Sequence, residues 1–422
     1  DGNRREFEHD LEGRRQVIRD RLGNTTMYVY DERGNIVSKT DALGNTTLNS
    51  YDANGNPKSS TDALGKTTYY EYSADGKLLS ITNVSGDTLT NVYNEKGKLK
   101  EVTSLDVVQF QLSYDERGMV TDIEDVMGNV TNCSYDDRSR LKSITDEIGQ
   151  YIKYTYDMDG NVVSAINGAG DTATFTYDER GNCTSRTEIK TGKNGQEKVT
   201  LNYSYDFANN LTKVIYADGT VVDVEYNSLG KISALSDPKG RRIIYKYDIF
   251  GNLEEIIYPD NTKEVFGYDE EGRNLWAKDR MGRKVTMVYD AVGNLLAKTY
   301  PNGAKVSFGY DAKYRITSIT DTNGAVTRYE YNDLDQNTAI IDALGNKTKF
   351  DYNKSGLIKA MTDPKGNTYS YEYDLGGNRT KIIMPDGSSI TSDYDARGRN
   401  IKQTDQNGYV TSFTYDGADR LT

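Results

Sequence analysis

The stretch YDERGNIVSKTDALGNTTLNSY, residues 30–51, holds one complete copy of the pattern that decides the fold of this chain. Asp31 and Gly34 mark a turn, because an Asp side chain can bond the backbone two residues on and Gly accepts a positive φ. Residues 41–45 form a second turn of the same chemistry. Each turn is flanked by a short strand-like run, which predicts one β-hairpin per copy.

The copy repeats along the whole chain with a period of 21 residues, interrupted by a single step of 28 residues. A fixed period of this length indicates a repeat array. We number positions in each unit from its leading tyrosine, so the first turn covers positions 1 to 5 and the second turn positions 11 to 15. His9 takes the tyrosine position in the first unit. The tyrosines, which we expect to form a structural ladder, are Tyr30, Tyr51, Tyr72, Tyr93, Tyr114, Tyr135, Tyr156, Tyr177, Tyr205, Tyr226, Tyr247, Tyr268, Tyr289, Tyr310, Tyr331, Tyr352, Tyr373, Tyr394 and Tyr415.

The strands between the turns alternate in polarity. Position 19 is aromatic in many units, as at Tyr154, whereas positions 18 and 20 are mostly polar, as at Lys153 and Thr155. This period of two predicts that positions 0 and 19 share the better-buried face of a sheet. The other strand places aliphatic residues at positions 6 and 9, as at Leu141 and Ile144, and that spacing predicts a bulge.

Turn residues recur with the same regularity. Asp fills position 1 in 15 of 20 units and Gly fills position 4 in 15 of 20 units, so the turns should share one conformation. Tyr314 and Asp335 replace the glycine of position 4, and we expect those turns to differ locally. The glycines that we expect to be structural are Gly34, Gly55, Gly160, Gly251 and Gly293 at position 4, and Gly44, Gly345 and Gly366 at position 14.

These patterns predict an all-β protein. About 20 tandem 21-residue hairpins would form one long antiparallel sheet, and open sheets rarely exceed about ten strands without curling. Native twist should therefore coil the sheet into a hollow shell or a spiral. We expect residues 1–422 to be a single array with a seven-residue insertion within 188–199, which we interpret as a mobile surface loop. Asp1-Gly2-Asn3 lies inside a turn and Leu421-Thr422 lies mid-unit, so we expect a section of a longer array.

Composition excludes several classes of function. The net charge of −12 argues against a nucleic-acid partner, which would require clustered Lys and Arg. The sequence contains no apolar run long enough for a transmembrane helix. With 34 Tyr and 39 Gly among 422 residues, the chain is a turn-rich aromatic β-protein rather than a disordered one.

No set of residues points to catalysis, a cofactor or a metal. His9 is the only histidine, and Cys133 and Cys183 lie 50 residues apart, so zinc has no ligand set. The Asp-rich loops lack the ligand spacing of known calcium motifs. Trp276, the only tryptophan, is either a local gap filler or a residue that stacks on a ligand. We expect catalytic, cofactor-binding and metal residues to be absent from this segment.

The repeat Tyr-Asp-x-x-Gly-Asn/Arg-Leu-x-x-Ile-Thr-Asp-x-x-Gly-Asn resembles the YD or RHS repeat, most clearly in the units from Tyr135 to Tyr156 and from Tyr352 to Tyr373. That family includes bacterial Rhs polymorphic toxins, wall-associated proteins, the C component of insecticidal toxin complexes, and teneurins. The resemblance implies a hollow shell of hairpins, which encloses a C-terminal effector in the toxins and belongs to an adhesion receptor in teneurins. It also implies a secreted or cell-surface location.

One family motif, the self-cleavage segment Asp-Pro-x-Gly-Leu, is not matched here. Asp237-Pro238-Lys239-Gly240 and Asp363-Pro364-Lys365-Gly366 look similar, but they occupy the ordinary second turn and are not followed by leucine. We therefore interpret both as turns and assign no autoproteolysis to this chain.

Three functions remain as hypotheses. The first is a structural region that encloses or displays other domains of the same longer chain, such as a toxin cargo. The second is an extracellular binding or adhesion module for glycans or a partner cell surface, which would need aromatic residues on exposed positions such as Tyr69 and Trp276. The third is a toxin enzyme, which would need sequence beyond Thr422.

Overall fold

A computed structural model describes residues 4–192, 195–416 and 419–422, and these residues contain 39 β-strands and no helix. Each strand pairs antiparallel with the next strand along the chain, so the hairpins form one continuous sheet, as the sequence predicted. The strands are β1 (Glu6–Asp10), β2 (Arg15–Arg19), β3 (Thr25–Tyr30), β4 (Ile36–Thr40), β5 (Thr46–Tyr51), β6 (Pro57–Thr61), β7 (Thr67–Tyr72), β8 (Leu78–Thr82), β9 (Thr88–Tyr93), β10 (Leu99–Ser104), β11 (Val107–Tyr114), β12 (Val120–Asp125), β13 (Val130–Tyr135), β14 (Leu141–Thr145), β15 (Tyr151–Tyr156), β16 (Val162–Asn167), β17 (Thr172–Tyr177), β18 (Cys183–Gly192), β19 (Gly195–Tyr205), β20 (Leu211–Ile215), β21 (Val221–Tyr226), β22 (Ile232–Ser236), β23 (Arg242–Tyr247), β24 (Leu253–Ile257), β25 (Lys263–Tyr268), β26 (Asn274–Lys278), β27 (Lys284–Tyr289), β28 (Leu295–Thr299), β29 (Lys305–Tyr310), β30 (Ile316–Thr320), β31 (Val326–Tyr331), β32 (Asn337–Ile341), β33 (Lys347–Tyr352), β34 (Ile358–Thr362), β35 (Thr368–Tyr373), β36 (Arg379–Ile383), β37 (Ser389–Tyr394), β38 (Asn400–Thr404) and β39 (Val410–Ser412).

The turns are five-residue loops closed by local hydrogen bonds. In the first turn of the quoted unit, the Asp31 N–H donates to the Asn35 carbonyl at 2.9 Å and the Gly34 N–H donates to the Asp31 carbonyl at 3.1 Å. Oδ1 of Asp31 accepts the backbone N–H groups of Arg33 and Asn35 at 2.8 and 2.9 Å. The second turn, residues 41–45, repeats this arrangement. Both turns therefore have the chemistry that the sequence pattern predicts.

A bulge follows the first turn in the units from Tyr30 to Tyr394, whereas the turn between β1 and β2 is followed by none. Tyr30 pairs with Ile36 and Val29 pairs with Ser38, so Val37 is an extra residue in its strand. The same shift recurs in the other units, and it confirms the bulge expected from the spacing of positions 6 and 9. A bulge increases local twist, so one bulge per hairpin contributes to the coiling of the sheet.

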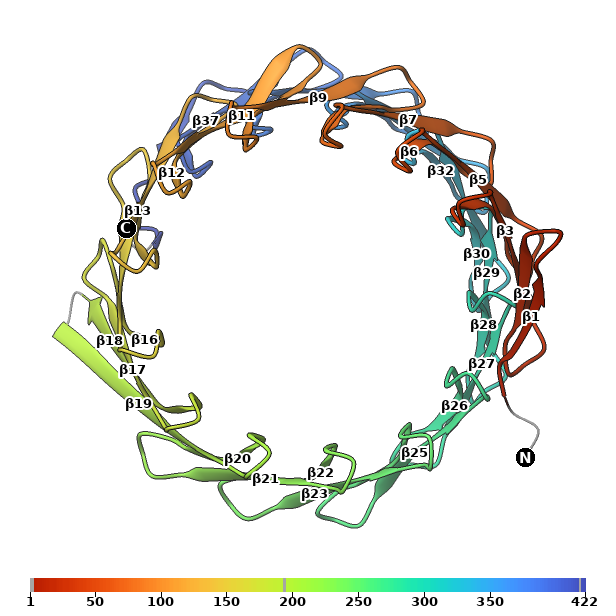
Figure 1. Ribbon diagram of the computed structural model, residues 1–422, viewed down its shortest axis with the longest axis horizontal. Helices are drawn as coiled ribbons and strands as arrows, with labels where there is room; N and C mark the ends of the chain where they lie inside the picture. The colour runs from red at the N-terminus through yellow and green to blue at the C-terminus, as the bar shows by residue number, and fades with distance from the viewer. Residues whose placement is uncertain (1–3, 193–194, 417–418) are drawn as a thin grey trace.

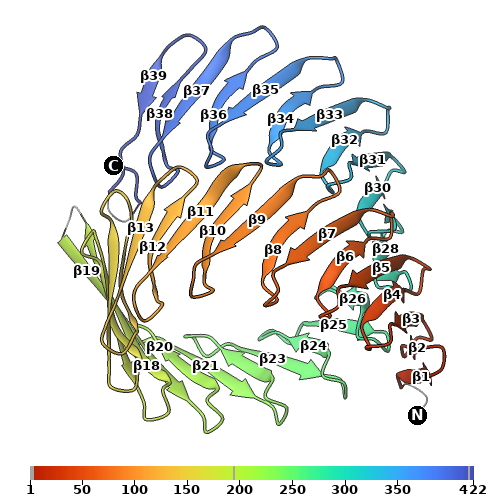
Figure 2. The same cartoon turned by 45° about the horizontal axis from the view of Figure 1, so that its top comes forward.

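The sheet coils into a ring that passes its own beginning (Figure 1). Seen obliquely, the strands from β32 to β38 run along the edge of the strands from β5 to β13 (Figure 2). The ribbon thus makes more than one full coil, and the two coils lie edge to edge. This is the hollow, coiled form of the sheet that the strand count predicted.

The two coils contact each other through their turns. Lys313 Nζ lies 2.8 Å from Asp62 Oδ2, and Arg397 Nε lies 3.0 Å from Asp146 Oδ2. Both aspartates belong to second turns, whereas Lys313 and Arg397 belong to first turns. The second-turn edge of the first coil therefore faces the first-turn edge of the second coil.

These contacts also fix the length of one coil. Asp62 and Lys313 lie twelve units apart, counted by the tyrosines that precede them. Lys66, in the same turn as Asp62, reaches Asp333 at 2.8 Å, one unit further on. One coil therefore takes about twelve hairpins. At about 4.8 Å per strand, its backbone measures roughly 120 Å around and roughly 40 Å across.

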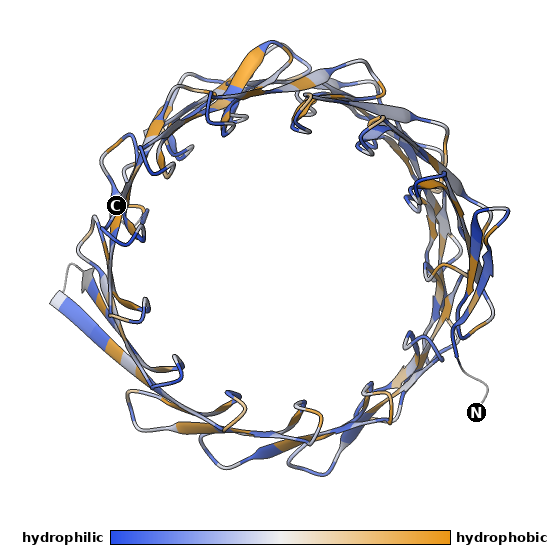
Figure 3. Ribbon diagram, in the orientation of Figure 1, coloured by the Kyte–Doolittle hydropathy of each residue, from blue (hydrophilic) through white to orange (hydrophobic). Residues whose placement is uncertain are grey.

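The sheet is a single layer with very little fully buried surface. Among the described residues, the buried apolar side chains are Val102, Ala234, Ala297 and Ala339, and no side chain with less than 2% exposure is large. Apolar and polar residues alternate around the whole ring (Figure 3). Stability must therefore come from many half-buried contacts that recur in each unit, rather than from one compact core.

The structure corrects two expectations. The insertion is not a mobile loop over its described length: β18 and β19 extend into it as paired strands, with Glu188 opposite Val199 and Gly192 opposite Gly195. Lys193 and Asn194, like Asp1-Gly2-Asn3, lie outside the described residues. The second correction concerns the turns that lack glycine at position 4. Tyr314 and Asp335 have φ values of 63° and 64° and keep the ordinary turn hydrogen bond, because the surrounding bonds hold the left-handed conformation.

Candidate functional site

The tyrosine ladder is the feature that the sequence singled out, and the structure places its members from Tyr30 to Tyr394 at the ends of strands before first turns, whereas Tyr415 makes an isolated bridge with Leu421. All of these tyrosines are half-buried. The aromatic residues at position 19 are likewise half-buried, whereas position 20 is exposed in most units. The ladder therefore follows the more protected face of the ribbon around the ring.

Most ladder hydroxyls share one kind of acceptor, whereas Tyr30 donates to the Gln16 side chain instead. Tyr156 donates to the Leu141 carbonyl at 2.7 Å and Tyr331 donates to the Ile316 carbonyl at 2.8 Å, in both cases to position 6 of the preceding unit. Because this acceptor lies beside the bulge, the hydroxyl adds a hydrogen bond between neighbouring strands where the register of the sheet shifts. The same bond is made by Tyr51, Tyr93, Tyr114, Tyr177, Tyr205, Tyr226, Tyr247, Tyr268, Tyr289, Tyr310, Tyr352, Tyr373, Tyr394 and Tyr415.

A cation covers many of the ladder rings. The Arg140 guanidinium lies 4.6 Å from the centre of the Tyr156 ring, and Arg315 lies at the same distance over Tyr331. In both cases a position 5 side chain reaches the tyrosine of the next unit, a favourable cation–π geometry. Burial raises the pKa of ladder tyrosines such as Tyr247, so these hydroxyls remain donors at neutral pH. The other pairs of this type are Lys77 with Tyr93, Lys98 with Tyr114, Lys231 with Tyr247, Arg273 with Tyr289, and Arg399 with Tyr415.

The turn aspartates are already engaged in hydrogen bonds. The Asn35 side-chain amide donates to Asp31 Oδ2 at 2.9 Å, and together with the backbone N–H groups at Oδ1 it lowers the pKa of Asp31. A carboxylate used in this way stabilises its turn and has few lone pairs left for a cation. Over the described ranges, no group of three or more His, Cys, Asp or Glu residues could hold a metal ion.

The turn glycines occupy the left-handed region. Gly34 has a φ of 85° and Gly44 has a φ of 86°, and no atom lies near the position that a Cβ would take. Glycine is therefore favoured here by the left-handed backbone conformation and not by a lack of space for a side chain. Positive φ is also found at Gly55, Gly160, Gly251, Gly293, Gly345 and Gly366.

The structure also shows the surroundings of His9 and Trp276, which the sequence singled out. His9 pairs with Gln16 in the exposed first strand. Trp276 lies directly over Gly267, because a Cβ built there would be 2.2 Å from the indole nitrogen. Lys278 and Lys284 lie 5.6 and 4.9 Å from the indole ring. The tryptophan thus covers a gap left by a glycine in the neighbouring strand.

The two cysteines lie apart in different hairpins. Cys133 and Cys183 are both free and half-buried. Burial is the main cause that raises the pKa of each thiol. Neither thiol therefore has the lowered pKa that marks a reactive cysteine.

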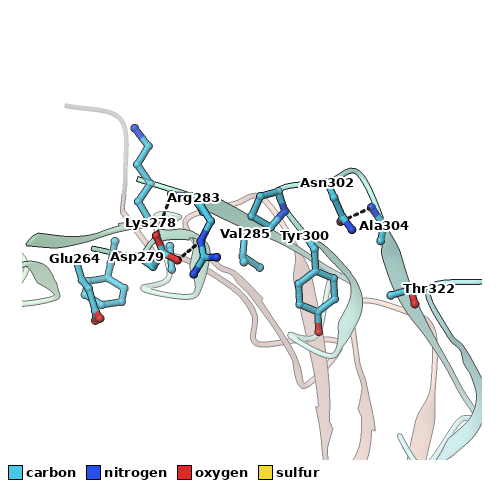
Figure 4. A pocket seen from close by; sticks show the side chains of 12 residues that line it. Glu264, Lys278, Asp279, Arg283, Val285, Tyr300, Asn302, Ala304 and Thr322 are labelled. Atoms are coloured by element: carbon cyan, nitrogen blue, oxygen red, sulfur yellow. Dashed lines mark hydrogen bonds and ion pairs between the residues drawn. The ribbon is translucent and has the colours of Figure 1, made fainter. Parts of the chain in front are cut away.

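A groove with a volume of about 750 Å³ lies along the second turns that follow β26 and β28. Tyr300, Val285 and the Asp279–Arg283 ion pair line it (Figure 4). Grooves at the same positions of other units are lined by Tyr258 and Ile189. Because the groove recurs with the repeat, it does not single out one unit as an active site.

Comparison with known families agrees with this architecture. The model of the teneurin YD-shell matches residues 67–281, 185–343 and 279–422, and the model of the RHS repeat matches residues 9–46. The chain belongs to the YD-shell family. No curated protein matches it.

Solved structures share the YD-shell fold. A crystal structure of TcdB2-TccC3-TEV has a TM-score of 0.62 at 12% identity, covering 99% of this chain and 32% of the other. TcdB2-TccC3-Cdc42 has the same TM-score and identity, with 99% and 33% coverage. The Photorhabdus luminescens Tc holotoxin pore has a TM-score of 0.53 at 12% identity, with 96% and 32% coverage. This YD-shell chain thus spans about a third of the length of each of these chains.

The YD-shell array contains features that the sequence pattern did not reveal. The tyrosine hydroxyl bond was missed, although a strict Tyr rather than Phe at position 0 was a signal that the hydroxyl matters. The contacts between coils have no periodic signal, since they join residues such as Asn129 and Ala396, which lie 267 positions apart. Within the described part of the chain, no helix is long and apolar enough to cross a membrane.

Proposed function

We propose that this array forms part of the wall of a secreted or cell-surface shell, and that the wall encloses or displays other domains of a longer protein. The observation that carries the proposal is the coil itself. Its single-layer sheet surrounds an open interior (Figure 1), and its two coils are fastened by turns on their edges. A wall of this kind separates an interior volume from solvent.

The proposal includes the absence of chemistry in this segment. Catalysis needs an acid, base or nucleophile in an environment of its own. Here the aspartates are used in turns, and similar grooves occur at equivalent positions of different units. We propose that the tyrosine ladder and the turn glycines serve the wall alone.

Imaging of the native protein tests the enclosing role. Protein purified from the culture medium of its source cells should show density from its other domains inside or against the coil by cryo-electron microscopy. An empty coil with every other domain tethered outside would contradict enclosure. Recovery of the protein only from the cytosol would contradict the proposed location.

A separate experiment tests the absence of chemistry. The purified 422-residue chain is incubated with and without divalent metals and then weighed by mass spectrometry. We expect one species of 47.3 kDa throughout. A discrete cut that one Asp substitution abolishes would contradict the proposal and show that this segment has proteolytic activity.

A further inference from the structure

The line along which the two coils meet, which we call the seam, is closed by turns alone. Among the described strands, none contacts a strand of the other coil. Two seam contacts are ion pairs made by a cation at position 3 of a first turn, Lys313 with Asp62 at 2.8 Å and Arg397 with Asp146 at 3.0 Å. The two cations lie four units apart, so the seam is fastened in the same way at two separate places.

Each seam cation is also held by an aspartate of its own coil. Lys313 Nζ lies 2.6 Å from Asp335 Oδ2, and Arg397 pairs with Asp419 in the same manner. Both aspartates occupy position 4 of the unit that follows the cation. Burial lowers the pKa of Lys313, but its hydrogen bonds to Asp335 and Asp62 outweigh that effect and raise the pKa overall. Each cation therefore lies between two carboxylates, one from each coil.

The same aspartates bind a second cation of the preceding turn. NH1 of Arg315 lies 2.6 Å from Asp335 Oδ1, and NH1 of Arg399 lies 2.6 Å from Asp419 Oδ1. Both arginines occupy position 5, are only 17% exposed, and bind the position 1 aspartate of their own turn at 2.7 Å. The position 4 carboxylate is thus anchored on a fixed guanidinium. We call each set a clasp: Asp62, Lys313, Arg315 and Asp335 form one, and Asp146, Arg397, Arg399 and Asp419 form the other.

Aspartate at position 4 is unusual in this array. Gly fills the position in 15 of 20 units, and Asp fills it in two, both of which follow a seam cation. Asp335 and Asp419 have φ values of 64° and 62°, in the left-handed region that glycine adopts more readily. Tyr314, a third exception at position 4, also bonds across the seam, to Asp41. A less favourable turn residue therefore occurs where its side chain serves the seam.

First turns that are followed by glycine at position 4 place their cations differently. Arg138 precedes Gly160 by one unit and donates to the Met158 carbonyl at 2.8 Å, within the same coil. Lys98 donates to the Gly118 carbonyl at 2.9 Å, again in the next turn. A carboxylate is a stronger acceptor for a cation than a backbone carbonyl. In both clasps the cation binds such a carboxylate and reaches the other coil as well.

We propose that the two clasps are a releasable closure of the coil, in which Asp335 and Asp419 are positioning residues that hold Lys313 and Arg397 against the other coil. Partly exposed ion pairs weaken as salt screens their charges. The hairpins do not depend on these pairs, because backbone hydrogen bonds join each strand to the next. The coil therefore has a closed and an open form with the same strands, and salt shifts the population towards the open form. This closure does not depend on what the coil encloses.

Three double variants separate the clasp carboxylates from the backbone of their turns. Asp335→Gly with Asp419→Gly removes the carboxylates and restores the residue that is usual at position 4. Asp335→Asn with Asp419→Asn keeps the size of the side chain and removes only its charge. Ser139→Gly with Asn209→Gly is the matched control, because both residues have a positive φ at position 4 and bond to Arg117 and Asn182 of neighbouring turns rather than to a seam cation.

The measurement is small-angle scattering of the 422-residue chain from about 0.01 to about 1 M salt, over which the Debye length falls from about 30 to about 3 Å. We expect the parent chain and the control to be compact at low salt and to reach a larger maximum dimension at high salt. Both clasp variants should have the larger dimension already at the lowest salt. Circular dichroism should show the same β signal for all four proteins.

Several results would overturn the proposal. A parent chain whose dimension is constant over the whole salt range has no releasable closure. Clasp variants as compact as the parent at low salt would show that Asp335 and Asp419 do not hold the seam. Opening of the glycine variant but not of the asparagine variant would show that charge is not responsible. A control that opens equally, or a loss of β signal during expansion, would assign the change to the turns or to unfolding.

Discussion

The hydroxyl of Tyr156 donates a 2.7 Å hydrogen bond to the backbone carbonyl of Leu141, fifteen residues earlier in the chain. The carbonyl lies in the neighbouring strand, beside the bulge, where the ladder of strand hydrogen bonds shifts register. A phenol that reaches this point holds each hairpin to the one before it. The pattern explains why the array uses tyrosine where phenylalanine would supply the same apolar area.

Removal of one ladder hydroxyl should weaken the array locally. Tyr247 donates to Ile232 at 2.8 Å, so Tyr247→Phe should cost about 1 kcal/mol, and Tyr247→Ala should cost more because apolar contact is also lost. Since Tyr247 is only half-buried, the alanine variant should fall below the roughly 3–5 kcal/mol that a fully buried aromatic residue would cost. Hydrogen exchange of the amides around Ile232 measures the effect. Tyr69→Phe, at a residue that is 54% exposed, is the control and should change little.

Trp276 offers an optical test of strand packing. A methyl group at residue 267 would lie 2.2 Å from the indole nitrogen, so Gly267→Ala should force the ring outwards. Trp276 is the only tryptophan, and its fluorescence should therefore shift to longer wavelength. Gly309→Ala in an equivalent pair, where the atom nearest to the new methyl group is the Ser318 hydroxyl at 2.5 Å, should leave the spectrum unchanged. An unshifted spectrum for the Gly267 variant would contradict the position assigned to the indole.

The contact between coils should open without unfolding of the sheet. Half-exposed ion pairs each contribute about 0–1 kcal/mol and are weakened by salt, so Lys313→Ala with Arg397→Ala should loosen the coil. Small-angle scattering should then show a larger maximum dimension, while the β signal in circular dichroism is retained. Lys142→Ala with Lys359→Ala, on exposed bulge positions, controls for loss of charge. Equal dimensions for both double variants would show that the ion pairs of Lys313 and Arg397 do not hold the coils together.

Alkaline pH should unfold the array through its tyrosines. Burial raises the pKa of Tyr114, Tyr247 and Tyr352 above that of an unfolded tyrosine, near 10. A raised folded pKa means that the stabilisation is complete below the unfolded value and is lost as pH rises through the folded value. We expect the melting temperature to fall from about pH 10 upwards, together with the tyrosinate absorbance. Ionisation of these tyrosines well before any loss of β structure would disprove the link.

Acid should act through the turn aspartates, with the opposite sign. Hydrogen bonds from Asn35 and Asn161 lower the pKa of Asp31 and Asp157, so their contribution is present above the unfolded pKa, near 3.9, and is lost as pH falls through the folded value. Melting temperature should be flat down to about pH 5 and then decrease. Asn227 opens the same turn without a titrating group, so its hairpin should keep its amide protection at a lower pH than the turn at Asp31. Loss of protection at the same pH in both hairpins would contradict this assignment.

Local structure was predictable here because the same turn and bulge signals recur in most repeat units. Asp31 with Gly34 fixes a turn, and the spacing of Leu141 and Ile144 indicates a bulge, from chemistry within a few residues. The number of hairpins per coil was not predictable, because small twists and bulges add over many strands before Asp62 meets Lys313. Tyr314 shows a further limit. Its left-handed backbone is an exception in sequence, yet the turn is unchanged and the side chain reaches Asp41 in the other coil.

The insertion between β18 and β19 shows where this architecture tolerates new sequence. A residue added inside a strand would exchange the two faces of the sheet and shift every later unit against the coil above it. Residues added at a turn instead lengthen two paired strands beyond the edge, and Tyr205 resumes the interval of 21 residues immediately afterwards. The β18–β19 hairpin accordingly projects from the ring without disturbing its neighbours (Figure 1). For protein engineering, this hairpin is the natural place to graft a foreign peptide, because the rest of the molecule can keep its register.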